Sequence, residues 1–142
     1  MAAVRRDTGR AMSQENVAVA RAFLEAYNRE DFDAALKHGA PGFVLDFSRA
    51  LGPYRGVYRR SEIPGFLEEL NATFESVRFQ PRDFIDAGDY VVVPLTIHFE
   101  GRDGIKVKAD TTNLWIFHDG AVERIVLYQE LHEALEAAGL SE

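Results

Sequence analysis

The second half of the chain contains four apolar segments in which odd and even positions are both hydrophobic. Turn sequences rich in glycine and aspartate separate these segments, which span 76–85, 90–99, 105–117 and 121–129. A strand with one face in water alternates apolar with polar residues, whereas here Trp115 stands between Leu114 and Ile116. Both faces of the predicted sheet must therefore be covered. We expect helices around a pocket on one face and a partner subunit on the other.

The first half of the chain has the periodicity of amphipathic helices. After Ser13, a suitable N-cap, apolar residues recur every three or four positions as far as Asn28. Asp31 is placed to cap a short helix over 32–38, with Gly39 at the position after its end. These two helices are expected to pack on one face of the sheet.

Two more helices and a short strand complete the predicted elements. One helix begins near Ser61, and a tail helix over 130–138 stops at Gly139. The segment 43–47 is typical of a strand, and glycine and proline make 48–56 a loop or a broken edge strand. The order of elements predicts one α+β domain.

Composition narrows the class of protein. A chain of 142 residues can bury one sizeable core, and without cysteine it has no disulfide or thiolate metal site, which fits a cytoplasmic location. No apolar run approaches the roughly 20 residues that span a bilayer. The net charge of −7 is spread along the chain, and the only basic cluster is Arg59 and Arg60. Nucleic acid and membrane are therefore not expected partners.

The first eleven residues differ from the rest. They contain Arg5, Arg6 and Arg10 with no hydrophobic stretch behind them, so they do not form a secretory signal. We expect 1–11 to be a disordered extension, or the product of a start codon placed ahead of Met12. The folded domain is predicted to span 12–142.

Several short segments resemble one known family when taken in order. They are YNREDFDAAL at 27–36, YRG at 54–56, FIDAGD at 84–89, Trp115 ahead of HDG at 118–120, and EALEAAGL at 133–140. In this spacing they are similar to the bacterial SnoaL-like branch of the nuclear-transport-factor-2-like superfamily. The resemblance implies a cone-shaped α+β fold in which a curved, mainly antiparallel sheet wraps around the N-terminal helices and encloses an apolar pocket. It also implies a homodimer through the outer sheet face.

The same resemblance assigns the catalytic positions of the superfamily's enzymes one by one. The oxyanion-hole tyrosine of ketosteroid isomerases corresponds to Phe23, and their protonated aspartate corresponds to Asn113. Their general base falls on Phe47, one residue after Asp46, and a shift of one residue on a strand reverses the side chain. The aspartate of similar polyketide cyclases falls among the aliphatic residues 125–127. Asp46 takes over the role of base only if the register slips or a bulge intervenes. On that condition the candidate catalytic residues are Asp46 as base and Asn113 as the group that orients a ligand oxygen.

Alternation from Asn113 predicts which side chains face the pocket. The candidate ligand-binding residues are Phe23, Tyr27, Leu95, Ile97, Thr111, Trp115, Phe117, Leu127 and Gln129. A mainly apolar wall with a few polar groups suits a flat hydrophobic molecule held by one or two hydrogen bonds. The filling of a core would produce the same apolar pattern. No paired metal-ligand spacing and no phosphate-binding loop occurs, so neither a metal nor another cofactor is expected.

The opposite face of the same strands predicts assembly. Leu114, Ile116, Val126 and Tyr128 would form an apolar patch that is exposed in a monomer. Because a large patch of this kind usually marks an interaction surface, we expect a homodimer.

Two classes of function remain open. One is a small-molecule-binding accessory protein, which we favour because the family's catalytic positions hold mostly unreactive side chains. The other is an enzyme of isomerase, cyclase or dehydratase type that moves a proton on a hydrophobic carbonyl or polyketide-like substrate, with Asp46 as base. A carboxyl group with a raised pKa inside the cavity would favour the enzyme, and a cavity without titratable groups would favour the binding protein.

Overall fold

The computed structural model describes residues 2–140, with side chains described from Ser13 onward. The chain begins with α1 (Ala2–Asn28) and α2 (Phe32–Leu36), followed by β1 (Gly39–Phe47), β2 (Gly56–Arg59), the 3-10 helix η1 (Arg60–Glu62) and α3 (Ile63–Thr73). It continues with β3 (Phe74–Pro81), β4 (Ile85–Ala87), β5 (Tyr90–Gly101), β6 (Lys106–His118), β7 (Ala121–Tyr128) and α4 (Leu131–Ala137).

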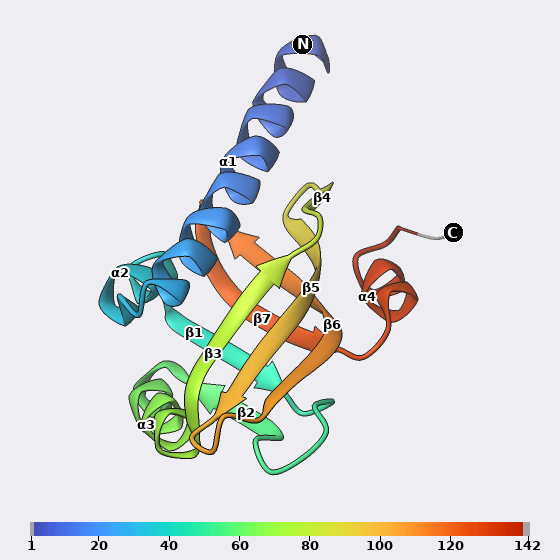
Figure 1. The fold of residues 1–142 in the computed structure, drawn as a ribbon. Coiled ribbons are helices and arrows are strands. Elements are labelled where there is room, and N and C mark those ends of the chain that lie inside the picture. The colour runs from blue at the N-terminus through green and yellow to red at the C-terminus, as the bar shows by residue number, and fades with distance from the viewer. Residues whose placement is uncertain (1, 141–142) are drawn as a thin grey trace.

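The described strands form one curled sheet. Their order is β2-β1-β7-β6-β5-β3, and β4 pairs with the beginning of β5. The pairing of β1 with β7 is parallel and the others are antiparallel. Figure 1 shows α1, α2 and α3 on one side of the sheet and α4 on the other. The predicted α+β class with a curved, mainly antiparallel sheet is confirmed.

The strand predicted over 76–85 is wrong at its end, because the chain leaves the sheet after Pro81 and returns as β4. Opposite this break lies Pro94, which has no N–H to donate to a neighbouring strand. The Pro94 carbonyl accepts a hydrogen bond from the N–H of Arg82 at 2.8 Å, which closes the break. A proline inside β5 thus divides its neighbour into two strands.

The expected helix end at Gly39 is also wrong. Helix α2 stops at Leu36, and Gly39 opens β1 in extended conformation opposite Val122. A Cβ at Gly39 would lie 3.0 Å from Arg60 Nη1 and 3.1 Å from Phe43. Close packing, and not a left-handed turn, therefore explains this glycine. The predicted cap at the other end of α2 is confirmed, since Asp31 Oδ1 accepts from the N–H of Ala34 at 3.2 Å.

Asn28 joins the end of α1 to the free edge of the sheet. Its Nδ2 donates to the Phe79 carbonyl at 2.7 Å, and its Oδ1 accepts from the Phe79 N–H at 2.9 Å. Since β3 is an edge strand, these backbone groups have no further strand to pair with. The pairing holds α1 across β3 and brings the rings of Tyr27 and Phe79 to 4.8 Å between centroids.

Arg102 connects the turn between β5 and β6 to the end of α3. The residue lies in the turn between β5 and β6, and its guanidinium donates to the carbonyls of Asn71 and Ala72 in the last turn of α3. It also pairs with Glu75 at 3.2 Å. A cation at a helix C-terminus complements the exposed carbonyls and the helix dipole. The hairpin is thereby attached to α3.

Helix α4 covers the outer face of the sheet. Ala134 and Leu135 of this helix pack on Val92, Leu114 and Val126, which are all buried. Ile116 and Tyr128 are partly buried at the margin of this second core. The predicted exposed patch is therefore largely covered by the chain's own tail helix. The reason for expecting a dimer is weakened accordingly, and the homodimer itself stays a prediction.

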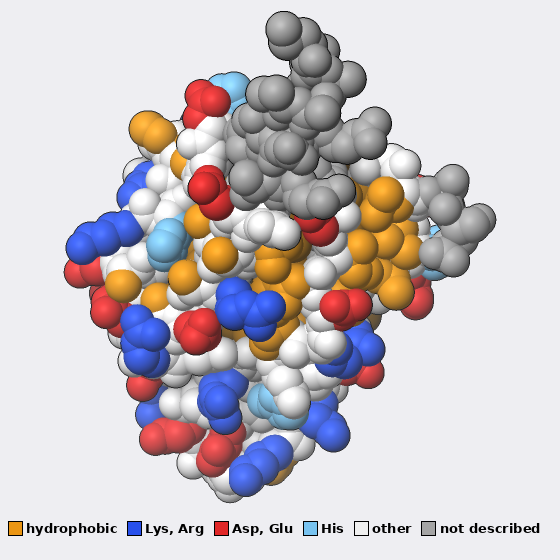
Figure 2. All heavy atoms as spheres, turned by 90° about the horizontal axis from the view of Figure 1, so that it is seen from above, with side chains coloured by type: hydrophobic (Ala, Val, Ile, Leu, Met, Phe, Trp, Pro, Cys, Tyr) orange, Lys and Arg blue, Asp and Glu red, His pale blue; other side chains and the backbone are white. Residues whose placement is uncertain are grey.

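The surface carries both charges. On the face seen in Figure 2, acidic and basic side chains are intermixed, and hydrophobic side chains gather beside the grey residues. Among the described helices, none is both long and apolar enough to cross a membrane.

The segment expected to be a disordered extension lies within the bounds of α1. The side chains before Ser13 lie outside the described residues. The expectation that 1–11 adds nothing to the folded domain therefore stays a prediction.

Candidate functional site: an apolar cavity

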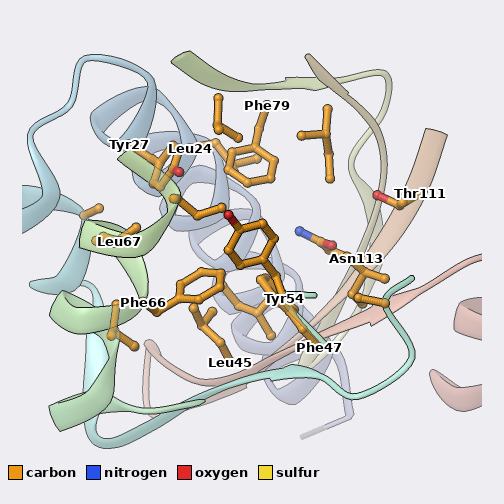
Figure 3. A pocket seen from close by; sticks show the side chains of 18 of the residues that line it. Leu24, Tyr27, Leu45, Phe47, Tyr54, Phe66, Leu67, Phe79, Thr111 and Asn113 are labelled. Atoms are coloured by element: carbon orange, nitrogen blue, oxygen red, sulfur yellow. The ribbon is translucent and has the colours of Figure 1, made fainter. Parts of the chain in front are cut away.

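A cavity of about 250 Å³ lies between the helices and the concave face of the sheet (Figure 3). Most of its wall is apolar and aromatic. The side chains come from α1, β1, α3 and β3 as well as from the central strands, and include Leu24, Phe43, Leu45, Phe47, Phe66, Leu67, Leu70, Phe79 and Ile125. Edge-to-face ring contacts, such as Phe47 against Phe66 with centroids 5.8 Å apart, build this wall.

The structure places most of the predicted ligand contacts on this wall. The residues that line the cavity are Phe23, Tyr27, Ile97, Thr111, Asn113, Trp115, Leu127 and Gln129. Leu95 and Phe117 point to the same side of the sheet but lie in the packed core. The inward alternation predicted from Asn113 is thus correct, while two of its members fill the core.

Sequence analysis missed the part of the wall that comes from the loop between β1 and β2. Ala50, Leu51 and Tyr54 all line the cavity, although Leu51 is 82% exposed. Figure 3 shows the Tyr54 ring in the middle of the site. Its hydroxyl lies 2.6 Å from Thr73 Oγ1 at the end of α3. The aromatic residue in a loop of glycine and proline was the available signal.

Asp46, the candidate base, is not among the residues that line the cavity. Leu45 and Phe47 line the cavity, so Asp46 between them points to the other face of β1. There its Oδ2 accepts from Arg124 Nη1 at 3.0 Å, and its Oδ1 accepts from Ser48 Oγ at 2.6 Å and Ser48 N at 3.1 Å. The alignment with the family puts the general-base position at Phe47. This agrees with the structure, in which the Phe47 side chain, and not that of Asp46, faces the cavity.

The electrostatics of Asp46 also differ from those of a general base. Burial by itself would raise the pKa of its carboxyl group, but the hydrogen bonds from Ser48 and the charges of Arg124 and Arg49 outweigh burial. The pKa is therefore lowered from its ordinary value. A carboxylate held in its ionised form is a weak base, and this one lies on the wrong side of the strand.

Asn113 points into the cavity without a protein partner. The residue is 5% exposed, and no hydrogen bond joins its amide to another described residue. Figure 3 shows the amide directed toward the middle of the site. A buried amide normally finds partners for its donor and acceptor groups. Here those partners would have to come from the contents of the cavity.

The same strand carries two further unpaired polar atoms. Thr111 Oγ1 and Trp115 Nε1 are buried and have no hydrogen-bond partner in the described part of the chain. They flank Asn113 at successive inward positions of β6. Gln129 lines the cavity beside them and donates from Nε2 to the Arg49 carbonyl at 2.8 Å.

Tyr27 supplies the polar group of the helical wall. Its ring packs against Phe32 and Phe79 with centroids 5.2 and 4.8 Å away. Burial, followed by the nearby charge of Glu30, raises the pKa of its phenol above the usual range. Tyr27 is therefore a protonated, neutral group at physiological pH.

No charged side chain belongs to the described wall of the cavity, which contains no aspartate, glutamate, histidine, lysine or arginine. Within the described residues, no group of three or more histidine or acidic side chains could hold a metal ion. The arrangement can hold a mainly apolar molecule and offer it neutral hydrogen bonds along β6.

A curled sheet closed by helices around such a cavity defines the nuclear-transport-factor-2-like class of proteins. The chain belongs to the SnoaL-like domain family, whose model matches residues 20–126. A comparison with curated proteins gave no match.

Solved structures of the same class share the fold. The chain is similar to an NTF2-like protein of unknown function from Burkholderia pseudomallei, with 21% identity, a TM-score of 0.71, and coverage of 86% of this chain and 95% of that one. It is similar to TerC, co-crystallised with polyporic acid, with 23% identity, a TM-score of 0.72, and coverage of 86% and 98%. A candidate polyketide cyclase from Xanthomonas campestris pv. campestris is 24% identical, with a TM-score of 0.66 and coverage of 89% and 98%.

Proposed function

We propose that this protein binds a flat, mainly apolar small molecule in the cavity, as an accessory protein that does no chemistry there. The observation that carries the proposal is the unpaired amide of Asn113, which points into an otherwise apolar space. On either side of Asn113, Thr111 Oγ1 and Trp115 Nε1 are buried without a partner among the described residues, and in a filled core each such group would cost about 1–3 kcal/mol. A ligand oxygen or N–H would recover that free energy.

The size and walls of the cavity support a ligand with fused rings. A volume of about 250 Å³ lies just below the range of common ligand pockets and suits roughly two or three rings. Aromatic side chains such as Phe23, Tyr54 and Phe66 offer flat surfaces for stacking. TerC, whose fold is similar, was co-crystallised with a small organic molecule, polyporic acid.

The absence of a base among the described wall residues favours binding over catalysis. Proton transfer from carbon needs a base within hydrogen-bond reach of the ligand. The titratable groups of the described wall are the tyrosines Tyr27 and Tyr54, and the pKa of Tyr27 is raised, which makes its phenolate scarce. Asp46 is turned away.

The test uses the single tryptophan as a reporter. Trp115 lines the cavity and is fully buried, so its fluorescence responds to an occupant. Titration with 2-acetylnaphthalene, a flat ketone that absorbs where tryptophan emits, should quench this fluorescence saturably. Asn113→Leu, which keeps the shape and removes the amide, should weaken binding about tenfold.

A matched control lies on the outer face of the same strand. Asp110 pairs with Thr96 at 2.7 Å on that face, so Asp110→Asn should leave the affinity unchanged. If neither this ketone nor a three-ring analogue such as anthrone quenches Trp115 up to its solubility limit, the proposal is refuted.

A further inference from the structure

Three polar side chains of the cavity that carry neither an aromatic ring nor a charge lie together at one corner. Thr111 and Asn113 occupy successive inward positions of β6, and Asn113 is opposite Leu127 of β7. The pairing of Thr112 with Tyr128 then brings Gln129 beside Thr111. We call Thr111, Asn113 and Gln129 the polar corner. The walls that face it, from α3 and β1, contribute apolar side chains.

All three members of the polar corner are neutral and can both donate and accept hydrogen bonds. Thr111 Oγ1 is buried without a partner among the described residues, and the Asn113 amide faces the cavity (Figure 3). Gln129 uses one N–H on the Arg49 carbonyl, which leaves its amide oxygen for other contacts. Such a set fits ketone and hydroxyl oxygens placed along one edge of a ligand.

Arg49, whose carbonyl accepts a hydrogen bond from Gln129, and Arg124 of β7 both carry their guanidinium groups on the other face of the sheet. The Arg49 guanidinium lies 4.7 Å from the centroid of the Tyr128 ring, which belongs to the outer core. Arg124 pairs with Asp46, also on that face. A carboxylate entering the cavity would therefore lose its water without gaining a cation, and an unpaired buried charge is strongly unfavourable.

We infer that the ligand is electrically neutral and carries its oxygen atoms along one edge, which lies against the polar corner, while its other edge is hydrocarbon. This inference rests on the proposed binding function and names the ligand class of the same cavity. Thr111, Asn113 and Gln129 determine the specificity, and flat carboxylates of equal size are rejected.

The test compares three ligands of the same shape by isothermal titration calorimetry at pH 7.5. They are 2-acetylnaphthalene, its hydrocarbon analogue 2-ethylnaphthalene, and the anion 2-naphthoate. The ketone should bind about tenfold more tightly than the hydrocarbon, because it pairs with the corner. It should bind at least about a hundredfold more tightly than the anion, because no cation compensates the buried charge.

Substitutions in the polar corner, with one control outside it, test which residues produce the preference for the ketone. Gln129→Leu and Thr111→Val should each reduce the preference for ketone over hydrocarbon by about threefold, with little change in the affinity for the hydrocarbon. The control is Gln80→Leu, which also replaces a glutamine by leucine but lies on the outer face, where Gln80 Oε1 is 2.7 Å from His98 Nε2. This variant should leave the preference for the ketone unchanged. Gln129→Arg should raise the affinity for 2-naphthoate at least tenfold, because it supplies the missing cation.

The outcomes separate this inference from the proposed function. If none of the three molecules binds, the proposed function fails and the inference fails with it. If all three bind, but the anion or the hydrocarbon binds as tightly as the ketone, the cavity is a binding site. The inference that the ligand is neutral and carries its oxygen atoms along one edge is then overturned.

Discussion

The hydrogen bonds of Asn28 to β3 can be removed by one substitution. Asn28→Ala deletes the side-chain groups that pair with the Phe79 carbonyl at 2.7 Å and the Phe79 N–H at 2.9 Å. Both backbone groups then lack a protein partner, since β3 is an edge strand. Tyr27 and Phe79 line the cavity on either side of this pairing, so the change also loosens the cavity wall.

The magnitude follows from the number and the burial of the lost bonds. Each buried backbone group left unpaired costs about 1–3 kcal/mol. These bonds are only partly buried, so water replaces some of the interaction and about 1 kcal/mol each is appropriate. The free energy of unfolding should fall by about 2 kcal/mol. For a domain of this size the melting temperature should fall by about 6 °C.

The assay is urea unfolding followed by circular dichroism, with Arg29→Ala as the control at the neighbouring exposed position. That control should stay within about 0.5 kcal/mol of the wild type. Asn28→Asp adds a second test, because it keeps the acceptor for the Phe79 N–H and points a carboxylate at the Phe79 carbonyl.

The aspartate variant has a defined pH dependence. The repulsion from the carbonyl raises the folded-state pKa of the new carboxyl group above its unfolded value of about 3.9. Its stability relative to the wild type is therefore greatest below that unfolded pKa and is lost as the pH rises through the folded pKa. The deficit should be smaller at pH 4 than at pH 7. A loss below 0.5 kcal/mol for Asn28→Ala, or a deficit of Asn28→Asp that grows on acidification, would refute the reasoning.

Two further predictions concern the outer face. Asp46→Asn should leave the affinity for 2-acetylnaphthalene unchanged, because Asp46 faces Arg124 and not the cavity, and should lower the free energy of unfolding by about 1 kcal/mol at pH 7. The pKa of Asp46 is lowered in the folded protein, so its contribution to stability is present above its unfolded pKa of about 3.9 and is lost as the pH falls through the folded pKa. Urea unfolding at pH 3 should therefore show a smaller difference in stability between the wild type and Asp46→Asn. Weaker ligand binding by Asp46→Asn would contradict the placement of this residue. Val126→Glu should lower the free energy of unfolding by more than 3 kcal/mol, because Val126 is buried beneath α4 and a carboxylate placed there loses its water. A stable Val126→Glu variant whose only change is from dimer to monomer in light scattering would show instead that Val126 lies at a subunit interface.

The sequence determined the features that depend on local periodicity. Two apolar faces in the last four segments required a sheet covered on both sides, and the structure has helices on both. Alternation along one strand is a property of the backbone, so the inward direction of Thr111, Asn113 and Trp115 followed once one of them was placed. The order of short segments was enough to place the chain in its family.

The tertiary structure decided what depends on contacts between distant segments. Asp46 meets Arg124, 78 positions away in the sequence, because β1 pairs with β7. The outer patch is covered by α4 because the chain turns back after β7, which no periodicity encodes. The unpaired state of Asn113 is likewise invisible in the sequence, because the presence of a partner depends on every wall of the cavity at once. Local patterns specify which way a side chain points, and only the assembled fold specifies what it meets.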